Sequence, residues 1–338
     1  MIRVGVIGYG YWGPNVARNF NSCPGAKLTA VCDAKPNRLS LAEAHYPSIK
    51  TYSNPGDLIR SRNVDVVAVV TPVYSHYALA RKALNHGKHV FVEKPFTATV
   101  TQAEKLIELA ARKNLKIMVD HTFLFTGAVR KMRELIEAGE LGKLFFYDSV
   151  RVNLGLFQHD VNVVWDLAPH DLSIMSYLIK EKPTAVSAHG GVHFQGELED
   201  VAYVTVHFEN PNFIAHFHVN WLSPVKVRRT LISGDRKMLL WDDLSADEKV
   251  KVYDRGVAIN GKNGENGLEK ILVSYRTGDV HIPRLDGTEA LKREAEYFVG
   301  CLERNEEPFN DGRAGLEVVR VLEAADRSLR KGGRRVEL

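Results

Sequence analysis

Lys94 stands where a side chain could exchange a proton with a bound hydroxyl group. It follows His89–Val92, an apolar run that predicts a buried strand, and Pro95 fixes the direction of the chain directly after it. A lysine that is partly removed from water gives up its proton more readily, which suits acid–base work near neutral pH. The alternative is a surface lysine paired with Glu93. The proline and the buried strand favour the chemical role.

Asp166 and His170 form a second group with suitable chemistry. They are four residues apart at the start of the apolar stretch Asp171–Ile179, which predicts a helix. Pro169 is tolerated only in a first turn, so the helix is expected to begin near residues 166–168. One helical turn would place both side chains on the same side, where the carboxylate can orient the imidazole and stabilise its charged form. Taken alone, the pair is also explained by a helix cap and a packed histidine.

A glycine-rich loop near the start of the chain has the spacing of a dinucleotide-binding fingerprint. Gly8, Gly10 and Gly13 follow the strand predicted at Ile2–Ile7 and precede a helical pattern, which is the context that this motif requires. The first glycine makes the turn, the second lets a pyrophosphate approach the backbone, and the third allows close packing of helix and strand. An ordinary glycine turn is the alternative. The expected cofactor contacts in this loop are Gly8, Gly10, Tyr11, Trp12 and Gly13.

Asp33 is the expected partner of the cofactor's ribose. It lies twenty residues beyond Gly13, at the end of the second predicted strand, where a carboxylate can accept a hydrogen bond from the 2′-hydroxyl. The same carboxylate would repel a 2′-phosphate, which favours NAD over NADP. Lys35 and Arg38 are close enough to keep NADP open.

Further cofactor contacts are expected at the carboxyl ends of other strands, because these ends line the ligand crevice of a doubly wound sheet. Thr71 and Pro72 follow the strand predicted at 64–70, and His76 opens the next helix. His76 is equally well explained as a packing residue beneath the cofactor. Glu93 and Lys94 complete the expected cofactor set.

The first part of the chain alternates short apolar strands with amphipathic helical segments. This order predicts an α/β dinucleotide-binding domain over residues 1–121, with a doubly wound parallel sheet. The strands are expected at Ile2–Ile7, Lys27–Cys32, Val64–Val70, His89–Val92 and Lys116–Val119, and the helices at Asn15–Asn21, Asn37–Ala44, His76–Asn85 and Val100–Lys113.

The second part of the chain has longer strands that alternate apolar and polar residues. They predict an α+β domain over residues 122–310, with a large, mostly antiparallel open sheet. The strands are expected at Leu144–Asn153, Pro183–His193, Val201–Glu209, Phe213–Trp221, Val227–Ser233 and Lys237–Trp241, with helices at Ala128–Ala138, Thr288–Arg304 and Arg313–Arg330. Residues 260–267 are interpreted as a surface loop, and residues 311–338 as a helix and basic tail that pack back on the first domain.

Composition narrows the class of protein. The 338 residues suggest two domains, and 45% hydrophobic and 25% charged residues are ordinary for a globular chain. The net charge of +4 is small and partly concentrated in the tail, which favours a solvated helix end over nucleic-acid binding. Three scattered cysteines, the lack of a signal-peptide pattern and the lack of a membrane-spanning run predict a cytoplasmic protein. His216 and His218 share one face of a strand without further ligand-spaced residues, so no metal is expected.

Taken together, the motifs resemble the Gfo/Idh/MocA oxidoreductases over essentially the whole chain. The resemblance is carried by the glycine fingerprint, Thr71-Pro72 with His76, Glu93-Lys94-Pro95, Asp166 with His170, and the late segments 289–294 and 311–315. It implies a Rossmann domain and hydride exchange between a sugar or polyol carbon and a nicotinamide. It also implies that Lys94 and His170 handle the hydroxyl proton while Asp166 orients the histidine and binds substrate. Homodimers or homotetramers through the open sheet are implied as well.

Within that family, residues 160–171 are similar to the group that acts on nucleotide sugars, such as UDP-N-acetylglucosamine 3-dehydrogenases. C3 of a UDP-sugar is therefore the expected site of reaction. The expected substrate contacts are Lys94, Gln158, Asn162, Trp165, Asp166, His170, Lys226 and Arg229, and Phe157 could also shape the pocket. Lys226 and Arg229 could supply cations for a diphosphate, although a solvated, exposed strand explains them equally well.

Two alternatives and one departure from the family pattern stay open. The substrate could instead be an inositol, a free sugar or an aminoglycoside-type amino sugar, because a fold does not fix its substrate. A non-catalytic, cofactor-sensing regulator could also use this scaffold. Leu124 stands where members of the family often carry an arginine, so any substrate contact of that arginine is in doubt here.

Overall fold

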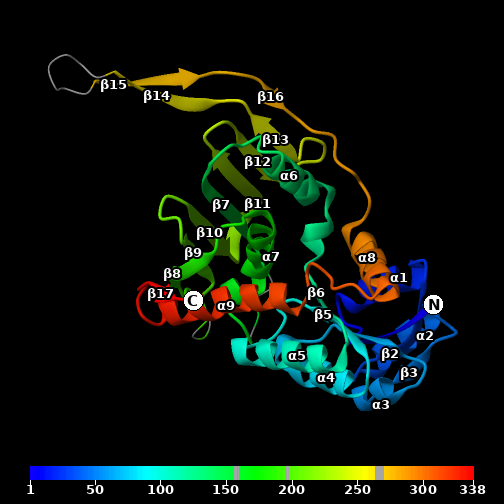
Figure 1. Cartoon of the computed structure of the whole chain (residues 1–338). Helices are drawn as coiled ribbons and strands as arrows, with labels where there is room; N and C mark the ends of the chain where they lie inside the picture. Colours follow the sequence, from blue (N-terminus) through cyan, green and yellow to red (C-terminus); the bar gives the residue numbers. More distant parts are fainter. Residues whose placement is uncertain (156–157, 159, 195, 197, 263–269) are drawn as a thin grey trace. The chain divides into compact units, whose positions relative to one another are not determined.

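The first sheet of the protein is built from six short strands, and every neighbouring pair is parallel (Figure 1). The strands are β1 (Ile2–Ile7), β2 (Ala26–Cys32), β3 (Lys50–Tyr52), β4 (Val66–Val69), β5 (His89–Glu93) and β6 (Ile117–Asp120). Their order is β3-β2-β1-β4-β5-β6, so the chain reverses its direction of winding between β1 and β4, where such sheets bind ligands. The computed structural model describes residues 1–155, 158, 160–194, 196, 198–262 and 270–338.

Helices make the crossovers between these strands, which confirms the expected doubly wound α/β fold. They are α1 (Gly13–Ser22), α2 (Pro36–His45), α3 (Pro55–Arg60), α4 (Val73–Asn85) and α5 (Val100–Lys113). Phe20 of α1 packs edge-on against Phe91 of β5 with ring centres 5.3 Å apart. The sequence did not reveal β3 and α3, because three and six residues are too few to display a period.

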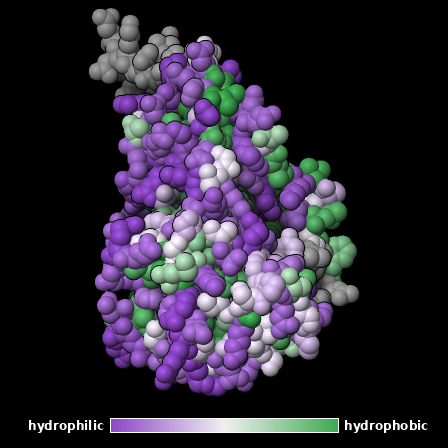
Figure 2. Space-filling model, turned by 90° about the vertical axis from the view of Figure 1, so that its right-hand side faces the viewer, coloured by the Kyte–Doolittle hydropathy of each residue, from purple (hydrophilic) through white to green (hydrophobic). Residues whose placement is uncertain are grey.

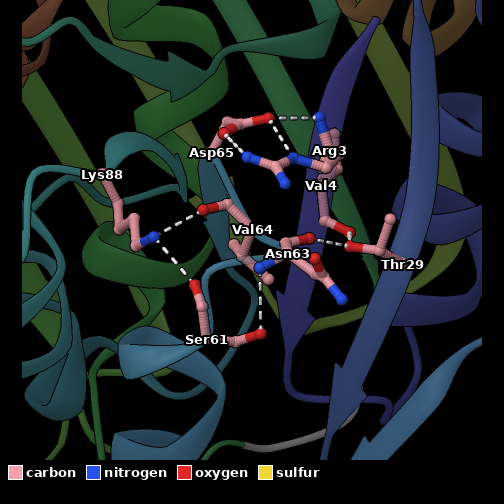
Figure 3. Close-up of polar contacts among 8 residues, drawn as sticks. All are labelled: Arg3, Val4, Thr29, Ser61, Asn63, Val64, Asp65 and Lys88. Carbon is pink, nitrogen blue, oxygen red and sulfur yellow. Dashed lines mark hydrogen bonds and ion pairs between the residues drawn. The ribbon is translucent and has the colours of Figure 1, made fainter.

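The amino ends of the strands are held by ordinary structural contacts (Figure 3). Arg3 on β1 forms an ion pair with Asp65 at 2.6 Å, and Lys88 donates to the carbonyl oxygens of Ser61 and Val64 at 2.9 and 2.6 Å. The Arg3 hydrogen bond lowers the pKa of Asp65. Because the pair is partly exposed to water, it contributes little to stability. This edge therefore holds the sheet together, and the residues with candidate chemical roles follow the opposite, carboxyl ends.

Two helices from the end of the chain complete the first unit. α8 (Ala290–Arg304) packs against α1 and against the short helix η1 (Thr122–Phe125), and the ring of Phe298 lies 6.1 Å from that of Phe91. The first compact unit comprises residues 1–126 and 287–323, and the second comprises 127–286 and 324–338. α9 (Gly312–Leu329) is divided between them. This division differs from the domains expected from sequence, because α8 buries its apolar face in the first unit although it follows the second sheet in the chain.

The second unit contains a nine-stranded sheet in the order β16-β13-β12-β11-β7-β10-β9-β8-β17. Its strands are β7 (Leu144–Leu154), β8 (Pro183–Gly191), β9 (Val201–Phe208), β10 (Ile214–Asn220), β11 (Leu222–Gly234), β12 (Met238–Asp242), β13 (Val250–Tyr253), β16 (Val280–His281) and β17 (Val336–Glu337). Only β7 and β10 pair in parallel among these described strands, so the expected, mostly antiparallel sheet is confirmed. Strands β14 (Gly256–Lys262) and β15 (Lys270–Arg276) form a separate hairpin that projects from it (Figure 1). The loop expected at 260–267 thus begins within β14, and residues 263–267 lie outside the described residues.

Helix α7 (Val163–Leu178) packs against β7, β9 and β10 of this sheet, and α6 (Gly127–Glu137) packs against α7. Beneath α7, Arg151 of β7 donates two hydrogen bonds of 2.8 Å to Asp171, and both side chains are almost fully buried. A paired and doubly hydrogen-bonded buried charge fixes geometry more than it adds stability. The ion pair therefore sets where α7 lies on the sheet.

The surface shows no sign of a membrane-spanning helix. Among the described residues, none of the helices is both long and apolar enough to cross a bilayer. On the face drawn in Figure 2, hydrophilic residues predominate and apolar residues occur in smaller groups between them.

Candidate functional site

The three glycines of the fingerprint have different steric reasons to be glycine. Gly8 has φ +97°, and a Cβ atom there would lie 2.1 Å from the carbonyl oxygen of Val70. A Cβ atom on Gly13 would lie 2.1 Å from the carbonyl oxygen of Gly8. At Gly10 no atom of the protein lies within 4 Å of the Cβ position. The fold therefore requires Gly8 and Gly13, whereas Gly10 leaves open space.

That open space adjoins the start of α1. The helix begins at Gly13, has Pro14 in its first turn and carries no acidic residue there. Unpaired backbone N–H groups and the positive end of the helix dipole favour an anion at such a position. Tyr11 in the same loop is 92% exposed. These features fit the pyrophosphate of a dinucleotide.

Asp33 both braces the glycine loop and keeps acceptor capacity for a ligand. Its Oδ2 accepts a hydrogen bond from the backbone N–H of Tyr9 at 2.7 Å, and its Oδ1 accepts one from the N–H of Lys35 at 2.8 Å. A carboxylate has about four acceptor sites, so each oxygen can accept one more hydrogen bond. The sequence did not predict the bracing role. These two hydrogen bonds leave the expected contact between Asp33 and the ribose possible.

Replacing Asp33 with asparagine is expected to shift cofactor preference toward NADP by about tenfold, because it removes the negative charge that would face a 2′-phosphate. Asparagine keeps one acceptor oxygen for the loop, and any remaining loop disturbance affects both cofactors alike. The ratio of the two dissociation constants therefore isolates the charge. Fluorescence titration with NADH and NADPH measures it. A ratio that stays constant or moves toward NADH would contradict the assignment.

His76 holds backbone groups together instead of presenting a free nitrogen. The ring is buried, with Nδ1 2.9 Å from the carbonyl oxygen of Pro95 and Nε2 2.6 Å from that of Thr71. Burial lowers the pKa of His76, and the two carbonyl contacts oppose that effect. Both nitrogens are engaged, so we propose that His76 supports the peptide next to Lys94 and does not contact the cofactor. Thr71 itself bonds through its hydroxyl to Ser75 at 2.6 Å, and Pro72 caps α4.

Lys94 follows a fully buried strand, as expected. The side chains of Val90, Phe91 and Val92 are 0% exposed, and Lys94 is only partly buried. The Lys94–Pro95 peptide bond is cis. Burial and, to a smaller extent, the positive charge of Lys94 lower the pKa of His121 to about 3. Lys94 thus directly follows β5 and lies near a neutral histidine, at the carboxyl edge that the glycine loop also occupies.

Asp120 is a candidate residue that the sequence interpretation missed. It ends β6 directly opposite Glu93 in the neighbouring parallel strand. Its carboxylate accepts a hydrogen bond from Nε1 of Trp12 at 2.9 Å and another from the hydroxyl of Thr122. The same strand-end rule that selected Lys94 could have selected Asp120. Trp12, expected to contact the cofactor, also ties the glycine loop to β6 through its indole N–H.

In the second unit, α7 begins earlier than expected. It starts at Val163, with Asn162 as its N-cap, and Pro169 lies inside it. The expectation that the helix starts near residues 166–168 was therefore wrong. A proline in this second turn has no N–H to donate to the carbonyl of Trp165, a loss that the helix tolerates because it is buried against the sheet on both sides of this position.

Asp166 and His170 lie one turn apart on α7, and both are partly exposed. Oδ2 of Asp166 accepts a hydrogen bond from Nε1 of Trp221 at 2.9 Å. Trp221 is 1% exposed, and its backbone N–H donates to the carbonyl of Asp200 at 2.9 Å. The sheet thus fixes the orientation of the Asp166 carboxylate through a buried indole. Trp221 is a second residue that the sequence interpretation did not place at the site.

Asn162 and Trp165 have structural partners for their polar atoms. Oδ1 of Asn162 accepts from the N–H of Trp165, and its Nδ2 donates to Glu199 and Asp326 at 3.0 and 3.1 Å. Nε1 of Trp165 donates to Asp326 at 2.9 Å, and the ring is 8% exposed. The polar atoms of these two expected substrate contacts secure the start of α7. We propose that they act on the substrate only by holding Asp166.

The remaining expected substrate residues differ in position. Gln158 is exposed in the loop before α7, and Phe157 lies outside the described residues. Lys226 is exposed on β11. Arg229 forms an ion pair with Asp242 at 2.6 Å. The next residue of the strand, Thr230, contacts the hydroxyl of Tyr147 on the face that α7 covers. Because neighbouring residues of a strand point to opposite faces, Arg229 lies on the face away from α7, so a shared pocket with Asp166 is not expected.

Lys94 belongs to the first unit, and Asp166 and His170 belong to the second.

Leu124 is buried at 3% exposure within η1. At this position the chain therefore uses an apolar packing residue. Among the described residues, no three histidine, cysteine or acidic side chains are grouped so that they could hold a metal ion.

Two family models match the chain. Residues 2–121 match an oxidoreductase family with an NAD-binding Rossmann fold, and residues 129–240 match the GFO/IDH/MocA C-terminal domain. Both halves of the sequence thus point to the same family, and the first match includes the glycine loop, Asp33 and Lys94.

Several curated relatives are similar. Myo-inositol 2-dehydrogenase of Thermotoga maritima is 27% identical over 344 residues, which cover 97% of this chain and 96% of that protein. The scyllo-inositol 2-dehydrogenase (NAD(+)) of Bacillus subtilis is 29% identical over 197 residues, or 56% of this chain and 58% of that protein. The matched regions span only 38% to 61% of four relatives, this one included.

Solved structures extend the similarity to the whole fold. UDP-N-acetylglucosamine 3-dehydrogenase GnnA from Acidithiobacillus ferrooxidans superposes with a TM-score of 0.78 at 25% identity, covering 98% of both chains.

Proposed function

Because this chain belongs to the Gfo/Idh/MocA family of NAD-binding oxidoreductases, we propose that it transfers a hydride between a sugar secondary hydroxyl and the nicotinamide. The observation that carries this proposal is the position of Lys94, at the end of a buried strand on the edge where the glycine loop lies. When bound, the dinucleotide supplies the hydride acceptor. The chain fits it through the open space at Gly10, the uncompensated start of α1 and the acceptor oxygens of Asp33.

The residues of the chain would supply orientation and proton transfer. Lys94 takes the hydroxyl proton during oxidation and returns it during reduction, and His170 shares this role. Asp166 orients His170 and accepts a hydrogen bond from a substrate hydroxyl. The Trp221 indole holds one oxygen of Asp166 and so fixes the carboxylate for these contacts. We favour NAD over NADP, because Asp33 presents a negative charge and Ala34 follows it.

C3 of a UDP-sugar is the substrate position that we propose first. The similarity to UDP-N-acetylglucosamine 3-dehydrogenase over 98% of the chain supports it. Lys226 is exposed and could meet a diphosphate. Arg229, which was expected to help, is already paired with Asp242, so this chain offers less positive charge for a diphosphate than its sequence suggests.

An inositol or free sugar is a second candidate, and two observations favour it. Inositol dehydrogenases are among the relatives, one of them over 97% of the chain. The pairing of Arg229 with Asp242 also leaves a ring without a nucleotide as the simpler ligand. The hydride and proton chemistry would be unchanged.

A substrate screen distinguishes these candidates. Adding NAD to the purified protein is expected to raise its melting temperature in a thermal unfolding assay, because ligands that bind the folded state stabilise it. UDP-sugars, inositols, free sugars and amino sugars are then added in parallel, and NADH formation is followed by absorbance. NADH from one class with further stabilisation identifies the substrate. Stabilisation by NAD with no turnover of any sugar would instead favour a cofactor-sensing regulator and contradict the proposed function.

A further inference from the structure

Three carboxyl side chains of the first unit lie on adjoining elements next to Lys94, although they are not grouped as metal ligands. Glu93 and Asp120 are direct partners at the carboxyl ends of the parallel strands β5 and β6. Glu294 of α8 is held beside the end of β6 by Asn310, whose Nδ2 donates to the carbonyl oxygen of Val119 at 2.8 Å and to Oε1 of Glu294 at 3.3 Å. Asp120 is 1% exposed and Glu294 is 0% exposed. Buried carboxyl groups this close to one another cannot all be ionised, because burial and mutual repulsion both oppose charge.

Asp120 is the member of the cluster whose two oxygens both accept hydrogen bonds from donors outside the cluster. It accepts the indole N–H of Trp12 at 2.9 Å on Oδ2 and the hydroxyl of Thr122 on Oδ1. Hydrogen bonds donated to a carboxylate favour its ionised form. Both oxygens of Asp120 thus already accept a hydrogen bond, so this side chain is placed to act as an acceptor toward its neighbours.

The surroundings of Glu294 favour the neutral, protonated form of its side chain. Oε1 has one long hydrogen bond, 3.3 Å from Nδ2 of Asn310, and Oε2 is buried without a donor of normal geometry among the described residues. Burial and the charge of Asp120 raise the pKa of Glu294 well above its usual range. A neutral carboxylic acid in this position can use its O–H group to donate a hydrogen bond to Asp120.

Glu93 completes the cluster on the side of Lys94. Burial and Asp120 raise the pKa of Glu93 well above its usual range, and the positive charge of Lys94 opposes this effect. His121, which precedes η1, and His76 on α4 also lie near Lys94, and burial lowers the pKa of both. Glu93 and Glu294 are thus the two carboxyl groups of the cluster whose pKa is raised.

We propose that Glu294 is a positioning residue: it stays a neutral acid, donates a hydrogen bond to Asp120, and so limits the negative charge beside Lys94 to one. Asp120 in turn anchors Trp12 of the glycine loop. Glu294 therefore couples the last part of the first unit to both the cofactor loop and the proton-transferring lysine. The consequence for the reaction rests on the proposed function, but the protonation state of Glu294 does not.

Infrared difference spectra test the protonation state directly. At neutral pH, wild type minus Glu294→Gln is expected to show the loss of a carbonyl band of a neutral carboxylic acid. Loss of carboxylate bands instead would overturn the proposal. Glu303→Gln, an exposed glutamate on the same helix, is the matched control and is expected to lose carboxylate bands.

Kinetics with the sugar found by the screen test the positioning role. Glu294→Leu keeps the approximate volume but removes the donor, and kcat/KM is expected to fall about tenfold, with rescue to within about threefold by Glu294→Gln. The pH profile of Glu294→Gln should match wild type, because a neutral residue replaces a neutral residue. A shift of that profile by about one unit toward lower pH, or equal activity of the leucine and glutamine variants, would overturn the proposal.

Failure of the proposed function gives a different pattern. If wild type turns over no sugar, the infrared measurement still decides the protonation of Glu294. Calorimetric titration with NAD then tests whether Glu294 helps to hold Trp12 in the cofactor loop. NAD is expected to bind more weakly to Glu294→Leu than to wild type, and Glu294→Gln is expected to recover the wild-type affinity. Equal NAD affinity in both variants would overturn the positioning role independently of any substrate.

Discussion

Replacing Lys94 with alanine is expected to lower kcat by roughly 10²- to 10⁴-fold, the usual contribution of a positioned acid–base group. The reason is its place directly after β5, whose three central side chains are fully buried, near His76, His121 and Glu93. None of these neighbours can substitute for it. Both histidines are buried with pKa values below their usual range, and His76 is engaged by two carbonyl oxygens.

The measurement is steady-state NADH formation with the sugar identified by the screen, at several pH values. Lys113→Ala, an exposed lysine at the end of α5, is the matched control and should behave as wild type. Thermal unfolding must show that the Lys94 variant is folded. If that folded variant produced NADH at the wild-type rate, Lys94 would have no part in proton transfer and His170 would have to act alone.

Much of the first unit could be predicted from the sequence, because local patterns determine it. Short apolar strands, helical periods and the glycine spacing are visible within windows of ten to twenty residues. The strand-end rule then selected Asp33, Thr71 and Lys94 without knowledge of the structure. These residues need only the sheet topology to be brought to one edge, and that topology is confirmed.

The contacts that could not be predicted join residues that are far apart in the chain. Glu294 reaches Asp120 only because α8 returns to the first unit, and Asp326 of α9 binds the Asn162 and Trp165 side chains at the start of α7. Trp221 was expected only as part of a strand, yet its indole fixes Asp166. No spacing rule connects such pairs.

Two other differences have local causes. Arg229 was expected near the substrate, but strand alternation and Asp242 place it on the other face of the sheet. Pro169 was expected to mark the start of a helix, but burial of α7 on the sheet outweighs one missing backbone hydrogen bond. In both cases tertiary packing determined an outcome that the local pattern left open.

Gly10→Ala is expected to weaken NAD binding without loss of stability, whereas Gly8→Ala is expected to lower the stability of the fold. At Gly10 the added Cβ meets no protein atom within 4 Å, and the backbone does not have a positive φ. Alanine there should leave the melting temperature unchanged or slightly raised, because it restricts the unfolded chain. It should nevertheless weaken NAD binding at least about tenfold, since the methyl group occupies the space through which the pyrophosphate approaches the backbone.

At Gly8 the added Cβ would lie 2.1 Å from a backbone oxygen at φ +97°. The strained backbone alone costs about 1–3 kcal/mol, and the contact adds to it, so a fall in melting temperature of roughly 5–10 °C is expected. Calorimetric NAD titration and thermal unfolding of both variants test the pair. Equal loss of stability in the two variants would mean that Gly10 serves the fold. A stable Gly10→Ala variant with wild-type NAD affinity would mean that the dinucleotide does not pass over this loop, and the cofactor site would then have to lie elsewhere on the sheet edge.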